Sequence, residues 1–273
     1  MKEELVQIEF NFPEGKQGNT EGLVSSIVEG MEKTGSTAYS GYSDVPALRQ
    51  GLLDHIGAGS ITQYKPISEA EKNKIKEIIS ETIEKCNEKL TIPTKNFAFV
   101  NPFLTTEKDG VFEGVMAVAT YGCVFHVFVD LDQYTKGSLE NTVAHELNHT
   151  IYYYDHYDNF GNYTLLDEIL LEGLAENFRE QYFDPKVTAW AGALSCNEAL
   201  VVLNNSIHIL DSRDRKTIRE FLFGNDVYKR WTGYSAGYWL VKEFLKNNAM
   251  SWNEIMKLEP KAFLDGVIKN NKA

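Results

Sequence analysis

The sequence predicts an α+β protein, with a small mixed or antiparallel sheet followed by a mostly helical C-terminal half. Two observations predict this class. Short runs rich in β-branched and aromatic residues lie ahead of residue 131, and helical periodicity dominates from Ser138 onward. Strands and helices that are segregated along the chain are typical of α+β folds. With 43% hydrophobic and 24% charged residues, the 273-residue chain has the composition of a globular protein.

The first 95 residues are expected to form a segment of helices and one strand, packed on a catalytic part that spans residues 96–273. Leu5–Phe12 alternates as a strand does, whereas Gly57–Pro66 is rich in Gly, Ser and Thr as loops are. Three helices are predicted: Glu21–Lys33, Val45–His55 and Ser68–Leu90. In the last of these, Ser68 and Glu71 fit a capping box. Its apolar stripe consists of Ile75, Ile78, Ile79, Ile83 and Cys86.

Three strands are predicted next. Phe97–Val100 is an apolar run that Asn101-Pro102 is expected to close, and Gly114–Thr120 and Cys123–Asp130 are expected to pair as a hairpin. The predicted helices that follow are Leu139–Tyr153, Leu165–Phe183, Cys196–Leu210, Arg213–Phe223, Ser235–Asn247 and Trp252–Lys257. We expect the whole chain to form one compact unit, with an active-site cleft between the sheet and the helical half.

The net charge of the chain argues against two classes of partner, and its cysteine content indicates a cellular compartment. The chain has 27 Lys and Arg against 39 Asp and Glu, a net charge of −12, which disfavours nucleic acid and anionic membrane surfaces. No run reaches the roughly 20 apolar residues of a membrane helix, and the first residues do not resemble a secretory signal. Three widely spaced cysteines, Cys86, Cys123 and Cys196, suit a reducing compartment. We therefore expect a cytoplasmic protein.

The run His145-Glu146-Leu147-Asn148-His149 is an HExxH pattern and carries the chemistry. Residues four apart lie on one face of a helix, so both imidazoles can bind one Zn²⁺ at ~2.0–2.1 Å. Glu146 neighbours the first histidine and can reach a water on the metal, which makes it the candidate general base. Ser138 is expected to cap this helix.

A catalytic zinc site needs a third protein ligand. Glu168, Glu172, Glu176 and Glu180 recur every four residues and lie on one helix face. Glu172 is favoured, because Gly173 beside it would let this helix approach the histidine-bearing helix closely. Glu176 would then orient a ligand histidine. Glu168 and, after it, Asp155 remain alternatives for the third ligand.

The oxyanion of peptide hydrolysis needs a further donor beside the metal. Tyr234 and Tyr238 are the candidates, four residues apart in a helical pattern where Gly237 allows close approach. His156 is interpreted as a surface residue, with a metal ligand or a substrate contact as the alternative. The remaining histidines are interpreted as structural: His55, His126 and His208.

These residues resemble the YjaZ-like family of predicted zinc-dependent proteases, which are gluzincin-type metallopeptidases. The similarity runs from about Phe97 to about Leu245 and includes Glu172-Gly173-Leu174-Ala175-Glu176, Phe221–Gly224 and Tyr234–Tyr238. It implies a zincin-like fold, with His145, His149 and Glu172 as zinc ligands and Glu146 as base. It also implies that an edge strand ahead of the metal helix pairs with extended substrate, a role open to Cys123–Asp130 or Gly114–Thr120.

The expected function is that of a zinc metallopeptidase acting on a peptide or protein. A catalytically silent zinc-binding or partner-binding protein and a zinc hydrolase of a small non-peptide amide are the alternatives. Glu146 favours an enzyme, because a structural zinc site uses four protein ligands and needs no base. Imidazole and carboxylate ligands would also accept Co²⁺, Mn²⁺ or Ni²⁺. The sequence leaves cleavage specificity, endo- or exopeptidase action and oligomeric state open.

Overall fold

A computed structural model describes residues 5–10, 20–39, 44–56, 61–105, 112–120, 122–156 and 162–269. The chain divides into two compact units, Met1–Tyr154 and Asp155–Ala273. This division does not coincide with the expected boundary after residue 95. The first strand, β1 (Val6–Phe10), pairs with β3 (Asn96–Thr105), so the beginning of the chain is part of the same sheet as the strands that follow it.

The first unit contains a five-stranded mixed sheet, which confirms the predicted sheet. Its strand order is β1-β3-β5-β4, where β4 is Val115–Thr120 and β5 is Val124–Asp130, and β2 (Ile61–Tyr64) also pairs with β3. β3 runs parallel to β1 and β5, whereas the β4–β5 hairpin is antiparallel, as predicted. β5 therefore lies inside the sheet and β4 lies at its end.

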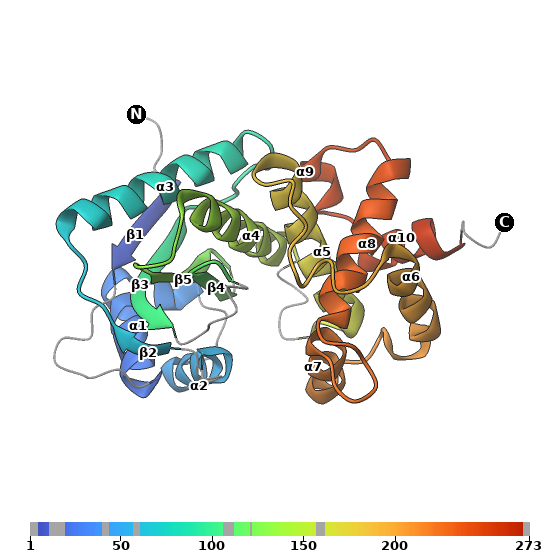
Figure 1. Cartoon of the computed structure of the whole chain (residues 1–273), viewed down its shortest axis with the longest axis horizontal. Helices are drawn as coiled ribbons and strands as arrows, with labels where there is room; N and C mark the ends of the chain where they lie inside the picture. Colours follow the sequence, from blue (N-terminus) through green and yellow to red (C-terminus); the bar gives the residue numbers. More distant parts are fainter. Residues whose placement is uncertain are drawn as a thin grey trace. The chain divides into compact units, whose positions relative to one another are not determined.

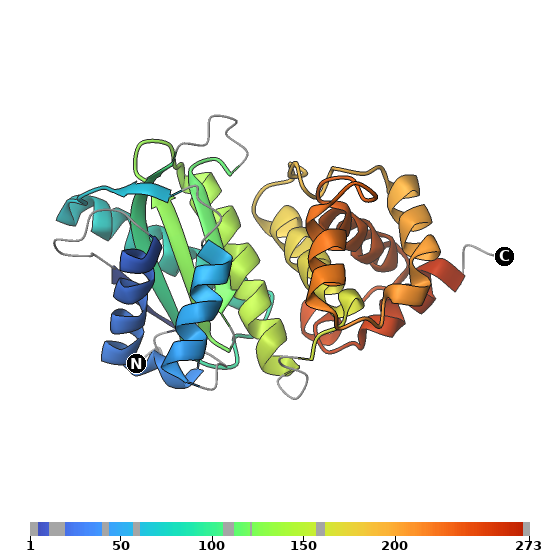
Figure 2. The same ribbon diagram turned by 90° about the horizontal axis from the view of Figure 1, so that it is seen from below.

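Helices cover both faces of this sheet (Figures 1 and 2). On one face are α1 (Thr20–Thr34) and α2 (Val45–Ile56), and on the other are α3 (Glu69–Asn87) and α4 (Lys136–Asp155). Apolar side chains of α1 and α2 form a core with the sheet: Val24, Ile27, Val28, Met31, Leu48, Leu52, Phe99, Val124 and Phe128. The layered packing fixes α4 against the sheet, and α4 carries the two histidines.

Two predictions about the strands are wrong. The loop predicted over Gly57–Pro66 contains β2, whose Ile, Thr and Tyr suit a strand once β3 is available to pair with. β3 does not close at Asn101-Pro102 but continues to Thr105. On one edge of β3, the pairing with β1 ends at Val100 and the pairing with β2 begins at Phe103. Pro102 lies between the two, so the strand tolerates a residue whose nitrogen cannot donate a hydrogen bond to a neighbouring strand on that edge.

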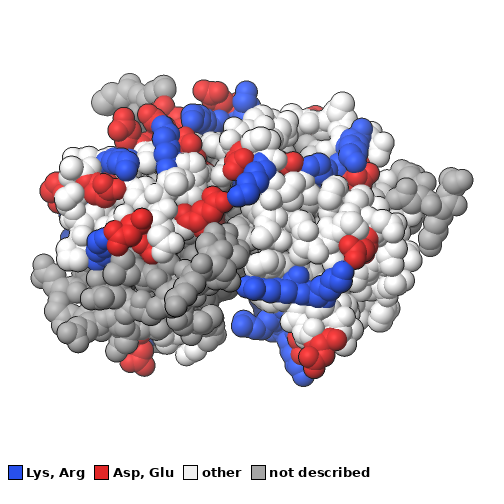
Figure 3. Space-filling view, in the orientation of Figure 1, with Lys and Arg blue, Asp and Glu red and all other residues white. Residues whose placement is uncertain are grey.

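α3 matches its prediction closely. The Ser68 hydroxyl accepts a hydrogen bond from the Glu71 amide at 3.2 Å, and the predicted apolar stripe is buried. The solvent side carries ion pairs such as Lys72–Glu69 at 2.6 Å. Figure 3 shows Lys and Arg interspersed with Asp and Glu over this part of the surface, which is typical of a solvated helix face.

Helices are the only regular secondary structure among the described residues of the second unit, as predicted for this half of the chain. Its helices are α5 (Leu165–Tyr182), α6 (Cys196–Asn205), α7 (Arg215–Phe223), α8 (Thr232–Asn247), α9 (Trp252–Ile255) and α10 (Pro260–Leu264). Capping boxes begin α5, α6 and α9. The helix predicted over Cys196–Leu210 ends at Asn205 and is followed by a 3-10 turn, Ile207–Ile209. Across the described stretches of both units, no helix combines the length and the apolar character needed to cross a membrane.

Gly173 of α5 packs backbone to backbone against Gly237 of α8. A Cβ on Gly173 would lie 2.2 Å from the Gly237 carbonyl oxygen, and a Cβ on Gly237 would lie 1.9 Å from the Ile169 carbonyl oxygen. The close approach expected from Gly237 is therefore confirmed. The partner expected for Gly173 was wrong: the space its missing side chain leaves is filled by α8, so Gly173 gives no support to Glu172 as a ligand.

Candidate metal centre

Local sequence places the start of α4. Thr135 and Ser138 cap the helix reciprocally: the Ser138 amide donates to the Thr135 hydroxyl at 3.0 Å, and the Thr135 amide donates to the Ser138 hydroxyl at 2.9 Å. Thr135 is thus the capping residue, and Ser138, which was expected in that role, is the third residue of the helix. Near the other end, the buried Thr150 hydroxyl bonds the Asn96 side chain at 3.0 Å, which ties α4 to β3.

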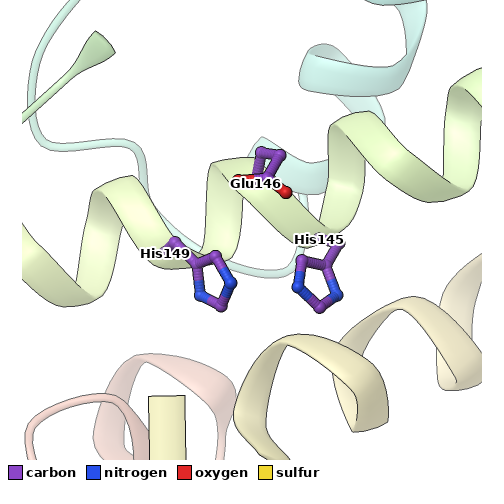
Figure 4. A group of neighbouring side chains, drawn as sticks. All are labelled: His145, Glu146 and His149. Carbon is purple, nitrogen blue, oxygen red and sulfur yellow. The ribbon is translucent and has the colours of Figure 1, made fainter. Parts of the chain in front are cut away.

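One face of α4 is apolar and packs in the core. Val143, Ala144, Leu147 and Ile151 are all at most 2% exposed. Because these residues fix the rotation of the helix, the neighbouring face must carry residues 145 and 149. The two imidazoles project side by side from that face, one turn apart (Figure 4).

His145, Glu146 and His149 form a group able to hold a metal ion, as predicted. One ligand atom from each lies within 4.8 Å of the others, and the two rings lie edge to face with centroids 4.5 Å apart. Glu146 and His149 are buried, and His145 is half-buried. Two imidazoles one helical turn apart are donors that zinc accepts in catalytic sites, so His145 and His149 fit this metal, with the Glu146 carboxylate beside them.

Burial, and to a lesser degree the neighbouring His145, hold the pKa of His149 well below its usual value. The neutral imidazole is the form that binds metals, so the environment favours the ligand state across the physiological pH range. His149 also lies near the ring of Tyr153, at 6.3 Å between centroids.

Glu146 makes a contact that the sequence did not predict. Its Oε2 accepts a hydrogen bond from the backbone amide of Ala119 on β4 at 2.6 Å. The two residues are 27 positions apart, and their meeting depends on the register of the β4–β5 hairpin and on the docking of α4. No side-chain motif carries that information, because the donor is a backbone amide.

The candidates for a third ligand lie in the second unit. Glu172 is half-buried on α5. Glu168 makes an ion pair with Arg215 at 3.1 Å, and its pKa is raised mainly by burial. Asp155 is the last residue of α4, and partial desolvation of its carboxyl group raises its pKa. The assignment of Glu172 stays a prediction.

Glu176 is fully buried in a polar network within the second unit. Its carboxylate accepts hydrogen bonds from Trp190 Nε1 at 2.8 Å and from the Thr188 hydroxyl at 2.9 Å, and it pairs with the buried Arg179 at 3.1 Å. These contacts tie α5 to the segment that follows it. A role in orienting a ligand histidine stays a prediction.

The two candidate tyrosines have different surroundings on α8. Tyr238 is buried, its hydroxyl donates to Glu180 at 2.8 Å, and Lys242 bonds the same carboxylate. Tyr234 is half-buried, and its ring packs against Phe223 with centroids 5.7 Å apart. The hydroxyl of Tyr238 is thus hydrogen-bonded within the second unit, and the role of either tyrosine as an oxyanion donor stays a prediction.

Two of the other histidines have defined structural positions. His126 on β5 is fully buried and stacks on Phe99 at 5.2 Å between centroids, and burial lowers its pKa to about 3. His156 is buried and its Nε2 lies 2.8 Å from the Met256 carbonyl oxygen. The placement of His126 agrees with its interpretation as a structural residue, whereas the expectation that His156 lies at the surface is wrong. The His55 side chain lies outside the described residues.

Comparison with known proteins gives the family of the chain. Residues 75–265 match the model of a family described as "Predicted Zn-dependent protease (DUF2268)". The chain is similar to "Uncharacterized protein YjfC" of Bacillus subtilis (strain 168), with 20% identity over 82% of this chain and 80% of that protein. It is also similar to "Uncharacterized protein YjaZ" of the same organism, with 27% identity over 48% of this chain and 52% of that protein. No solved structure matches the chain.

Proposed function

This chain belongs to the family of predicted zinc-dependent proteases, and from that premise we propose that it hydrolyses peptide bonds with a zinc ion held by His145 and His149. The single observation that carries the proposal is the group on α4: two imidazoles and a carboxylate with ligand atoms within 4.8 Å of one another. A structural zinc site uses four protein ligands, whereas a catalytic one needs an adjacent base. Glu146 supplies that base.

Zinc at such a site lowers the pKa of water to about 7 and polarises a carbonyl group. The residues of the chain perform the rest. Glu146 accepts the proton of the attacking water and then delivers it to the leaving amine. The neutral His149 presents a ring nitrogen to the metal, and Tyr234 is proposed to donate to the oxyanion, with Tyr238 as the second candidate.

We keep Glu172 as the proposed third ligand. Support comes from the resemblance to the family, which implies Glu172 in this role, and from the half-buried position of Glu172 on α5. Glu172→Gln is expected to weaken zinc binding at least tenfold. Glu168→Gln serves as the matched control on the same helix and is expected to leave zinc affinity unchanged.

β4 is proposed as the strand that pairs with extended substrate. Of the two strands considered for this role, β5 has a neighbour on each side, whereas β4 ends the sheet. A peptide added along this edge would extend the sheet by main-chain hydrogen bonds. The zincin-like and gluzincin assignments, a peptide or protein as substrate and a location in the cytoplasm belong to the same proposal. The free thiols of Cys86, Cys123 and Cys196 support a reducing location.

The test is cleavage of unstructured peptides by purified zinc-loaded protein, followed by mass spectrometry. We expect cleavage that a chelator abolishes and that Glu146→Gln lowers at least a hundredfold with zinc content unchanged. Glu140→Gln is the control, because it removes another carboxylate from α4 outside the metal-binding group. Cleavage that survives in Glu146→Gln would contradict the mechanism. Cleavage of a small amide but of no peptide would favour the non-peptide alternative.

A further inference from the structure

Ala119 directs its backbone away from β5, toward the edge at which β4 ends the sheet among the described residues. The Asp130 amide donates to the Gly114 carbonyl at 2.8 Å, and the β4–β5 register pairs Ala119 with Phe125. In an antiparallel ladder, alternate residues bond the partner strand. Gly114 and the even-numbered residues after it therefore face β5, and Val115, Ala117 and Ala119 present their amides and carbonyls to the outer edge.

Glu146 already occupies one of these outer positions. The 2.6 Å bond from the Ala119 amide to its carboxylate is charge-assisted, and such bonds are roughly twice as strong as neutral ones. An extended peptide that paired along β4 would need the same amide for one of its carbonyl groups. One N–H cannot make two short, well-aligned hydrogen bonds at once, so peptide and carboxylate compete for it.

We propose that the Ala119 amide holds Glu146 in the free protein and passes to a substrate carbonyl when an extended peptide pairs with β4. Pairing of the peptide with β4 then releases the Glu146 carboxylate from the Ala119 amide. Ala119 is thus a positioning residue for Glu146, and base release is coupled to strand addition. This inference rests on the proposed function, because it assigns a regulation to the same site.

The first test is backbone amide exchange in the metal-free protein, followed by NMR. We expect slow exchange at Ala119 in the wild type and at least tenfold faster exchange in Glu146→Ala. Glu146→Gln is the matched variant, since its side-chain oxygen still accepts and should preserve slow exchange. Ala117, which faces the same edge, is the internal control and should exchange equally in all three proteins. Equal exchange at Ala119 in wild type and Glu146→Ala overturns the proposal.

The second test is binding of a capped, extended hexapeptide of alanine and phenylalanine to metal-free protein. Without the carboxylate to displace, Glu146→Ala is expected to bind the peptide roughly fivefold more tightly than wild type. Equal or weaker binding by Glu146→Ala, or no binding to either protein, overturns the competition.

Both tests use metal-free protein, so their outcome is independent of catalysis. Tighter peptide binding by Glu146→Ala, combined with zinc-loaded wild type that cleaves no peptide, would reject the proposed function and leave the competition at Ala119 standing. Chelator-sensitive cleavage by the wild type, combined with exchange at Ala119 that is unchanged in Glu146→Ala, would support the proposed function and reject the competition at Ala119.

Discussion

At the scale of single residues, the site combines a local pattern with one long-range contact. His145 and His149 meet because four residues make roughly one helical turn, which any sequence reading can use. Glu146 meets Ala119 because a strand and a helix far apart along the chain dock in one register. The first fact is visible in the sequence and the second is not, so the ligands could be predicted and the resting partner of the base could not.

A buried histidine outside the metal-binding group gives a prediction about pH. His126 is fully buried, neither ring nitrogen has a hydrogen-bond partner among the described residues, and burial lowers its pKa to about 3. The unfolded chain binds a proton at this residue below a pH of about 6.5, whereas the folded protein does not. His126 therefore makes the free energy of unfolding fall as the pH drops from about 6.5 toward 3.

The contribution of His126 to the pH dependence of the unfolding free energy can be isolated with His126→Phe, which keeps a flat ring against Phe99. Between pH 7 and 5, the wild type should lose about 2 kcal/mol more unfolding free energy than the variant. His149 titrates in the same direction but is present in both proteins, so it cancels in the difference. Urea unfolding of metal-free protein at both pH values measures the effect. Identical pH slopes would show that His126 has the same pKa in the folded and unfolded chain and would contradict the prediction.

At the scale of elements, the sequence predicted which helices and strands exist better than it predicted which of them pack or pair with one another. Helices α3 to α5 and the β4–β5 hairpin carry strong periodicity or caps of their own, and their predictions hold. β2 was missed because a four-residue strand is stabilised by a partner that is distant in sequence. The partner of Gly173 was misassigned for a related reason: a small residue indicates that something approaches closely, but not which helix does.

The contact between α5 and α8 predicts the cost of two substitutions. Gly173→Ala and Gly237→Ala each place a methyl group about 2 Å from a carbonyl oxygen of the neighbouring helix, so the helices must separate. Each is expected to lower the free energy of unfolding by about 3 kcal/mol. Gly137→Ala on α4 is the control, since its new Cβ would have its nearest neighbour at 3.8 Å. It should be neutral or stabilising by ~0.4–1 kcal/mol.

Denaturant unfolding of the three variants measures these differences. A loss below 1 kcal/mol in both α5 and α8 variants, or an equal loss in Gly137→Ala, would contradict the backbone-to-backbone packing.

At the scale of the whole molecule, a zinc ion that binds only the folded chain must stabilise it. At a free zinc concentration one hundred times the dissociation constant, the gain is about 2.7 kcal/mol. For a protein of this size, that corresponds to a rise of roughly 5–10 °C in the unfolding temperature. Differential scanning calorimetry with zinc and with a chelator measures it. His149→Ala should unfold at the same temperature in both conditions, and an equal rise in that variant would place the bound zinc elsewhere.

The same scale marks what the sequence alone could not supply. The chain divides after Tyr154 and not after residue 95. The pairing of β1 with β3 joins the first residues to the same sheet as the later strands, and no change of composition along the chain indicates this pairing. A linker rich in Gly, Pro or Ser would have indicated a domain boundary in the sequence. The boundary after Tyr154 has no such linker, because α4 continues across it to Asp155.

The central claim is that two imidazoles of α4 hold a catalytic zinc ion, and metal content tests it most directly. After zinc loading and exhaustive exchange into metal-free buffer, we predict one zinc per chain in the wild type and in Glu146→Gln. We predict none in the His145→Ala, His149→Ala double variant. Wild-type protein without zinc, or a double variant that retains one zinc per chain, would contradict the account.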